Sequence, residues 1–145
     1  LNVSPPLTNA GNLSACGTSA AQFINYTLDG VNYSISSNVV GDSLVAYTND
    51  SLGTTFNGFQ LSGDNLIWFG AMQTNNVPGT YEIDELEVQN YTYRDITIVP
   101  PFKITFTKFP QTAGQFYEGS FTGSFKDRAN ATHTLSGTFK LRRSF

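Results

Sequence analysis

Hydrophobic and polar side chains alternate strictly along the last third of the chain, from Phe102 to Arg143. Between Tyr117 and Lys126, aromatic residues and glycines occupy one phase, and Glu, Ser, Thr and Lys occupy the other. Successive side chains of a strand point to opposite faces of a sheet, so this pattern predicts one buried face and one solvated face. The neighbouring segments FKITFTKF and HTLSGTFKLRR repeat the alternation. Together they predict three consecutive β-strands.

The first two thirds of the chain predict further short strands. Asp29-Gly30 separates Phe23–Leu28 from Val31–Ser36 and favours a two-residue hairpin, because both positions of its type I′ turn need positive φ. The other expected strands are Ser43–Thr48, Thr55–Ser62, Leu66–Met72, Thr80–Asp84 and Arg94–Val99.

Two local features interrupt these strands. The apolar phase changes between Ile83 and Leu86, which predicts a β-bulge or a strand break at Asp84-Glu85. Pro100-Pro101 lacks N–H donors for a sheet and therefore predicts the end of the strand Arg94–Val99.

The composition also indicates an all-β protein. Thr, Ser and Asn make up 43 of the 145 residues, whereas charged residues make up 13%. Thr and aromatic residues favour strands, and Asn, Ser and Gly favour turns. We expect residues 21–145 to form a single antiparallel two-sheet β-sandwich, with a β-barrel of the same strands as the alternative. Residues 1–20 contain Pro5-Pro6 and scattered Gly and Asn, and predict a poorly structured N-terminal arm.

Charge is distributed unevenly along the chain. Residues 1–99 carry nine acidic side chains and one basic side chain, whereas residues 100–145 carry seven basic and two acidic side chains. We expect acidic and basic strands to lie side by side and to pair across the sheet. The Lys and Arg residues are too sparse for a nucleic-acid patch, so no nucleic acid is expected as a partner.

Few residues of this chain are suited to catalysis or metal binding. One Cys and one His cannot form a tetrahedral zinc site, and no G-x-G-x-x-G or P-loop motif occurs. His133 is interpreted as an exposed turn histidine, and the carboxylates of Glu82, Asp84 and Glu85 as solvated or paired surface groups. We therefore expect no enzyme activity, no cofactor and no metal. No apolar run approaches the roughly 20 residues of a membrane helix, so no transmembrane segment is expected.

Aromatic residues in polar surroundings provide the best candidate for a binding site. Trp68 is the only tryptophan, and Tyr91 and Tyr93 form a same-face pair in the polar segment NYTYRD. Sugar rings stack on exposed aromatic rings that have Asn, Gln or Asp beside them. We therefore predict that Trp68, Tyr91 and Tyr93 bind a ligand, with Trp68 as a core residue being the alternative.

The segments YTLDGVNYSI, VPGTYEI and ITFTKFP…GSFTGSF…LSGTFKLRR carry a family resemblance. In this order, over about Phe23 to Arg143, the chain resembles small secreted or lipid-anchored β-sandwich proteins of Bacteroidetes-type bacteria. The resemblance implies an extracytoplasmic location in the periplasm, at the cell surface or in the medium, and it provides no catalytic residues.

These observations predict a non-catalytic extracytoplasmic protein that binds a glycan or a surface protein. Three alternatives remain open. One is a barrel that holds an apolar ligand among its phenylalanines, and another is a structural or assembly component of the cell surface. The third is a glycosidase-like enzyme that uses the carboxylates of Glu82, Asp84 and Glu85.

Overall fold

A computed structural model describes residues 21–49, 53–61, 63–72 and 74–145 of the chain. The predicted arm, residues 1–20, and Ser62 lie outside these residues. The described part forms nine strands and no helix, which confirms the all-β prediction. The strands are β1 (Phe23–Leu28), β2 (Val31–Ser36), β3 (Asp42–Asn49), β4 (Gly53–Gln60), β5 (Leu66–Ala71), β6 (Gly79–Val88), β7 (Thr97–Lys108), β8 (Phe116–Lys126) and β9 (Thr132–Arg142).

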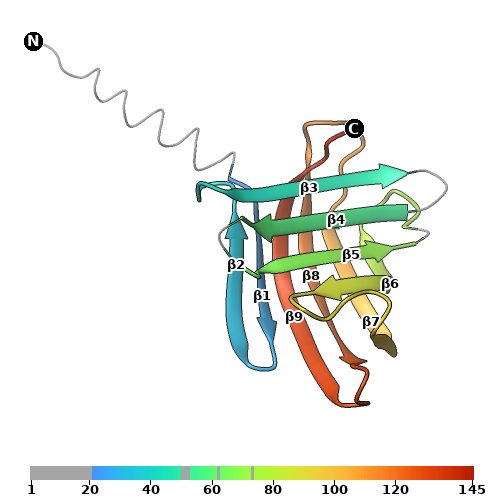
Figure 1. The fold of residues 1–145 in the computed structure, drawn as a ribbon. Coiled ribbons are helices and arrows are strands. Elements are labelled where there is room, and N and C mark those ends of the chain that lie inside the picture. The colour runs from blue at the N-terminus through green and yellow to red at the C-terminus, as the bar shows by residue number, and fades with distance from the viewer. Residues whose placement is uncertain (1–20, 50–52, 62, 73) are drawn as a thin grey trace, which may run out of the picture.

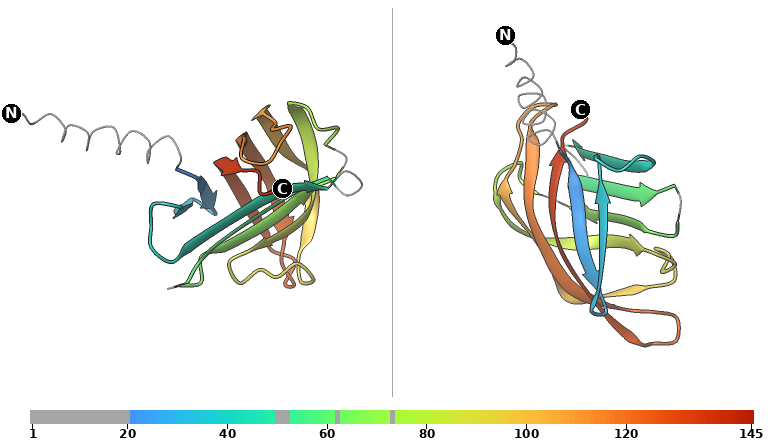
Figure 2. Two further views of the ribbon diagram at one scale, coloured as in Figure 1. Left: turned by 90° about the horizontal axis from the view of Figure 1, so that it is seen from above. Right: turned by 90° about the vertical axis from the view of Figure 1, so that its left-hand side faces the viewer.

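The nine strands form one antiparallel sheet in the order β2-β1-β9-β8-β7-β6-β5-β4-β3. The sheet curls on itself, and β3, β4 and β5 cross steeply in front of β8 and β9 (Figures 1 and 2). The fold therefore has the two facing layers expected of a sandwich, while one continuous sheet nearly closes into the barrel of the alternative.

Strand β6 turns the corner between the two layers. Its residues 79–82 pair with β7, and its residues from Ile83 onward pair with β5. Gly70 and Ala71 of β5 face Glu85 and Ile83, so Asp84 is an extra residue without a partner on β5. This is the predicted β-bulge, and it lets the strand bend from one layer into the other.

The edge strand β3 is tied to the other edge strand, β2, and to the C-terminal residues. The Asp42 carboxylate of β3 accepts hydrogen bonds from the Ser36 N–H of β2 at 2.9 Å and from Gln60 Nε2 at 3.3 Å. In the middle of β3, Ala46 forms a parallel bridge with Arg143, and its carbonyl accepts from the Ser144 N–H at 2.8 Å. These contacts satisfy edge groups that would otherwise be open to another chain.

The prediction that Pro100-Pro101 ends a strand is wrong. Strand β7 runs through both prolines from Thr97 to Lys108, and its register against β8 shifts between Val99 and Lys103. The missing N–H groups are tolerated because the prolines lie at this irregularity, where the pairing with β8 is interrupted.

The interior is filled with aromatic rings. Phe56 lies at the centre, with ring centroids 4.9–5.9 Å from those of Phe69, Phe106, Tyr117 and Phe139. All five side chains are at most 2% exposed. Aromatic pairs at these distances add roughly 0.5–1.5 kcal/mol each beyond the burial of apolar area.

Glycines on the inner face of β8 and β9 provide the space that these rings occupy. A Cβ at Gly123 would lie 2.3 Å from the ring of Phe102, and a Cβ at Gly137 would lie 2.5 Å from the ring of Phe121. The recurrent Gly-x-Phe pattern of the sequence thus reflects rings that cover glycines on neighbouring strands.

An acidic and a basic strand lie side by side, as expected, at β6 and β7, where Glu82 faces Lys103. Within the described residues, Lys or Arg forms an ion pair with a carboxylate at Lys108–Glu118 (3.2 Å) and Arg128–Asp95 (3.7 Å). Both pairs are largely exposed, so each contributes about 0–1 kcal/mol.

Replacing Gly137 with alanine tests the importance of this close packing. The new Cβ would lie 2.4 Å from the main-chain oxygen of Asn25, so we expect a loss of about 1–3 kcal/mol or more in the free energy of unfolding. Denaturant unfolding measures the loss. Gly63→Ala is the matched control, because no heavy atom lies within 4 Å of its Cβ and a change within about 0.5 kcal/mol is expected. Equal stability of the two variants would contradict the packing account.

Candidate ligand-binding surface

A partly exposed aromatic pair lies on the outer face of β5. Alternation along β5 directs Ile67 and Phe69 into the core and Trp68 outward. Tyr93 reaches Trp68 from the loop of residues 89–96 that connects β6 to β7, and their ring centroids lie 5.6 Å apart in an edge-to-face arrangement. Tyr93 is 47% exposed, and Trp68 is half-buried. Two of the three predicted site residues are thus adjacent and accessible.

The loop of residues 89–96 sends Tyr91 and Tyr93 to different places. Gln89 has a φ of 56°, Tyr91 turns back to bridge Val88, and the Thr92 hydroxyl donates to the Asp95 carboxylate at 2.8 Å. Side chains two residues apart point to the same face only in an extended strand, whereas Tyr91 and Tyr93 lie in a turn. The predicted same-face pair of Tyr91 and Tyr93 is therefore wrong.

Tyr91 packs on the opposite side of the loop against the β8–β9 hairpin. Its ring centroid lies 4.5 Å from that of His133 and 5.3 Å from that of Phe125. It is half-buried. Tyr91 therefore anchors the loop, while Tyr93 faces outward beside Trp68.

His133 is held between two carboxylates and is not the exposed turn residue that was expected. Its Nδ1 lies 2.6 Å from Asp29 Oδ2, and its Nε2 lies 2.8 Å from Asp127 Oδ2. Its side chain is 13% exposed. A neutral imidazole has one N–H, so both contacts are hydrogen bonds to carboxylates only when the ring is protonated. The three side chains tie the β1–β2 turn to the β8–β9 hairpin.

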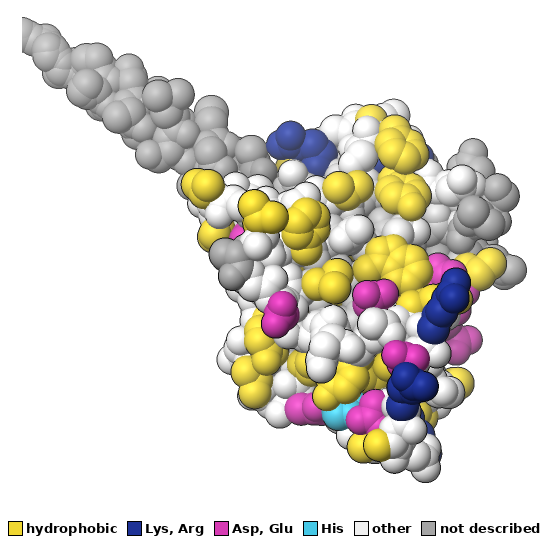
Figure 3. All heavy atoms as spheres, viewed as in Figure 1, with side chains coloured by type: hydrophobic (Ala, Val, Ile, Leu, Met, Phe, Trp, Pro, Cys, Tyr) yellow, Lys and Arg dark blue, Asp and Glu magenta, His cyan; other side chains and the backbone are white. Residues whose placement is uncertain are grey.

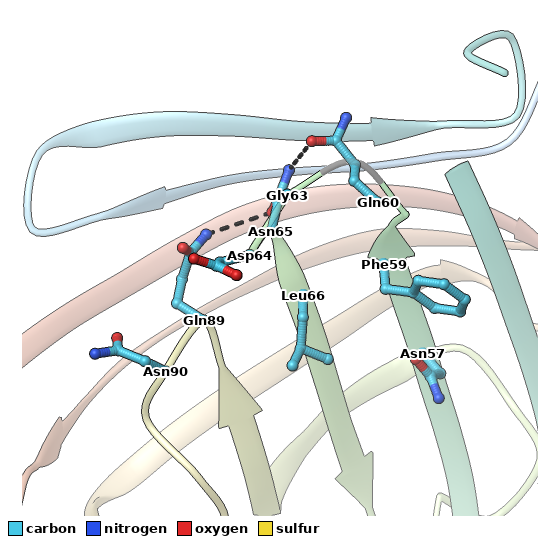
Figure 4. A pocket seen from close by; sticks show the side chains of 9 residues that line it. All are labelled: Asn57, Phe59, Gln60, Gly63, Asp64, Asn65, Leu66, Gln89 and Asn90. Carbon is cyan, nitrogen blue, oxygen red and sulfur yellow. Dashed lines mark hydrogen bonds between the residues drawn. The ribbon is translucent and has the colours of Figure 1, made fainter. Parts of the chain in front are cut away.

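A hollow of about 440 Å³ lies at the ends of β4, β5 and β6 (Figure 4), and its lining residue Asn57 faces Trp68 across β4 and β5. Leu66, two residues before Trp68, and Phe59 on β4 provide its apolar part. Asp64 provides its one charged lining side chain. The amide side chains that line the hollow are Asn57, Gln60, Asn65, Gln89 and Asn90.

Asn65 fixes the polar side of this hollow. Its Oδ1 accepts from the Tyr26 hydroxyl and lies 3.4 Å from Gln89 Nε2, and its Nδ2 donates to Gln60 Oε1 at 3.2 Å and to the Ser34 carbonyl at 3.2 Å. Burial raises the pKa of Tyr26 to about 12, so this phenol remains a neutral donor. The network joins β1, β2, β4 and the start of the loop of residues 89–96, and it holds the amides in place before any ligand arrives.

Two smaller hollows adjoin the same loop. One of about 270 Å³ shares Asn90 with the large hollow and also includes Tyr91 and Arg128. The other, of about 240 Å³, is lined by Asp84 and Tyr93. The loop of residues 89–96 thus contributes to the lining of three hollows, and the sequence pointed to this loop only through its two tyrosines.

Two acidic residues of β6, Asp84 and Glu85, lie near this surface. Partial desolvation raises the pKa of Asp84, while Glu85 lies across from Gly70 on the outer face of the sheet. Within the described residues, no three Cys, His, Asp or Glu side chains are arranged to hold a metal ion. The aromatic packing of the interior gives no support to the alternative of an enclosed apolar ligand.

Comparisons with known proteins do not assign this chain to a family. No family model, curated protein or solved structure matches this chain. The described residues include no helix that is long and apolar enough to cross a membrane.

The contacts of His133 predict how stability depends on pH. The hydrogen bonds that His133 donates to the carboxylates of Asp127 and Asp29 raise the pKa of His133 above 6.5. The contribution of His133 to stability is therefore complete below pH 6.5 and is lost as the pH rises through the raised pKa. The hydrogen bond with His133 lowers the pKa of Asp127 below 3.8. Burial favours a higher pKa for Asp29, but the hydrogen bonds that its carboxylate accepts from His133 and from the Thr134 N–H outweigh burial and lower this pKa below 3.8. The cluster of His133, Asp29 and Asp127 therefore contributes most to stability between about pH 3.8 and pH 6.5.

Thermal unfolding of the wild type and of His133→Gln, measured from pH 5 to pH 9, tests this expectation. The wild type is expected to unfold at a higher temperature near pH 5–6, and the difference is expected to shrink toward pH 9. A difference that stays constant across this range would contradict a protonated His133.

Proposed function

We propose that this protein is a non-catalytic glycan-binding protein whose site is the surface formed by Trp68, Tyr93 and the large hollow beside them. The observation that carries the proposal is the partly exposed pair of Trp68 and Tyr93, which lies near a hollow lined by five amide side chains. One of these amides, Asn57, faces Trp68 across β4 and β5. A sugar ring offers an apolar face to an aromatic ring and hydroxyl groups to polar side chains at the rim. Aromatic rings and a few fixed polar groups in a concave surface are typical of small-ligand sites.

The arrangement of the surface supports this use. Figure 3 looks onto the outer face of β3–β6 and shows apolar side chains among uncharged groups, with acidic side chains nearby. The amides offer both donors and acceptors, as sugar hydroxyls require. Asp64 is the only charged side chain in the hollow, so a neutral glycan fits better than a uronic or sulfated one.

The proposed location is outside the cytoplasm, as the resemblance to exported β-sandwich proteins implies. A surface protein is the second candidate partner. It is favoured by exposed apolar side chains at the corner next to the hollow, where Leu61 is 79% and Val40 is 102% exposed.

Glycan-array screening followed by calorimetry tests the proposed function. Neutral oligosaccharides are expected to bind the wild type, and Trp68→Ala or Tyr93→Ala is expected to weaken binding about 10- to 100-fold, because each ring supplies roughly 1–3 kcal/mol of contact. Phe116→Ala is the matched control, because this half-buried aromatic residue lies on β8 between Lys140 and Arg142. Absence of any neutral glycan on the array, or an equal loss in the control, would contradict the proposal.

A further inference from the structure

The outer face of β1, β8 and β9, in the other half of the sheet, carries a further, shallow hollow. This hollow of about 410 Å³ is separate from the loop of residues 89–96. Tyr26, Phe121 and Gly137 belong to its lining, but both ring side chains are buried in the core. The exposed or partly exposed side chains of the lining are short, uncharged and able to form hydrogen bonds. They are Asn25, Thr27, Ser120, Thr122, Ser136 and Thr138, which we call the hydroxyl array.

Strand register arranges the hydroxyl array in two rows. The first row contains Ser120, Thr138 and Asn25, which face one another across β8, β9 and β1. The second row contains Thr122, Ser136 and Thr27 on the same three strands. In a β-sheet such groups repeat about every 4.8 Å between strands and about every 6.8 Å along them. The array is therefore a regular lattice of polar groups.

Four hydroxyl groups of this lattice are available to a ligand. The side chains of Ser120, Thr122, Ser136 and Thr138 make no hydrogen bond with another described residue, and all four residues are exposed. The outermost pair differs, because Asn25 accepts from Ser34 at 2.6 Å and Thr27 donates to Asn32 at 2.7 Å. The array thus combines free hydroxyls with side chains that β2 holds in place.

The chemistry of the array excludes several classes of partner. It contains no charged side chain; Lys103 lies across from Thr122 at its border, and Glu118 and Lys140 face each other one row beyond it. Nucleic acids and anionic lipids bind through clustered cations, which are missing here. A stable protein interface needs a core of large apolar side chains, which are missing as well. A neutral ligand with many hydroxyl groups remains.

We propose that the hydroxyl array is a second glycan site, which binds an uncharged polysaccharide along its rows. A neutral hydrogen bond contributes only about 0.5–1.5 kcal/mol, so a chain that engages several hydroxyls at once is required. Because the array and the Trp68 surface belong to different halves of the sheet, one molecule can hold two stretches of polysaccharide. Such two-site binding increases avidity without new contacts.

NMR titration of the Trp68→Ala, Tyr93→Ala double variant tests this site separately from the proposed function. The probes are cellohexaose, mannohexaose and maltohexaose, with hexagalacturonate as the charged comparison. We expect a neutral hexasaccharide to shift the amide signals of residues 120–124 and 134–138. Absence of such shifts with all three neutral probes, or stronger shifts with hexagalacturonate, would overturn the second site. Loss of binding at the Trp68 surface alone leaves these signals responsive.

Removal of the free hydroxyls provides a second readout. Thr122→Val together with Thr138→Val keeps the shape of the side chains and is expected to weaken binding of the neutral hexasaccharide about ten-fold. Thr132→Val is the matched control, because this exposed threonine lies on β9 outside the array. Equal affinities of the double variant and the control would also overturn the proposal.

Discussion

A single sheet must enclose a cluster of large aromatic rings, and this constraint determines the rest of the structure. Phe56 on β4 contacts Tyr117 on β8 and Phe139 on β9, although these strands are far apart in the order of the sheet. Only a sheet that curls on itself brings these rings together. The curl in turn requires small residues where rings meet a neighbouring strand, as at Gly123 and Gly137, and a bulge at Asp84 where the chain changes layers.

This constraint determines where ligand-binding groups can lie. Rings and aliphatic side chains occupy the interior, and the hollows described above lie on the outer faces of the sheet or at its connecting loops. The bend of β6 leads into the loop of residues 89–96, which carries Tyr93 to Trp68 and anchors Tyr91 against His133. The other outer face, over β1, β8 and β9, exposes polar side chains, while the rings of Tyr26 and Phe121 in the same stretch are buried in the core. The two proposed glycan sites thus differ in chemistry, one based on stacking and the other on hydrogen bonds.

Alternation along the chain was sufficient to predict most of the fold. The hairpin at Asp29-Gly30 and the bulge at Asp84 were predicted correctly, because period-two patterning and turn residues depend on local sequence. The continuation of β7 through Pro100-Pro101 was not predicted. It depends on a register irregularity that only the pairing with β8 reveals.

The candidate site was harder to predict for the same reason. Trp68 was identified as the only tryptophan and Tyr93 from its polar neighbours, but their contact arises from a turn that no periodic pattern describes. The position of His133 between Asp29 and Asp127 joins residues 104 and 6 positions apart. Asp29 was recognised only as a turn residue, since its second role as a carboxylate partner becomes visible when the two hairpins meet.

The central claim is that a neutral glycan stacks on Trp68, and the emission of this residue tests it directly. Because Trp68 is the only tryptophan of the chain, the tryptophan fluorescence of the protein reports on this position alone. Titration with a neutral oligosaccharide that binds the wild type is predicted to shift the emission to shorter wavelength in a saturable manner, with the affinity that calorimetry gives. Calorimetric binding with unchanged emission would contradict the claim.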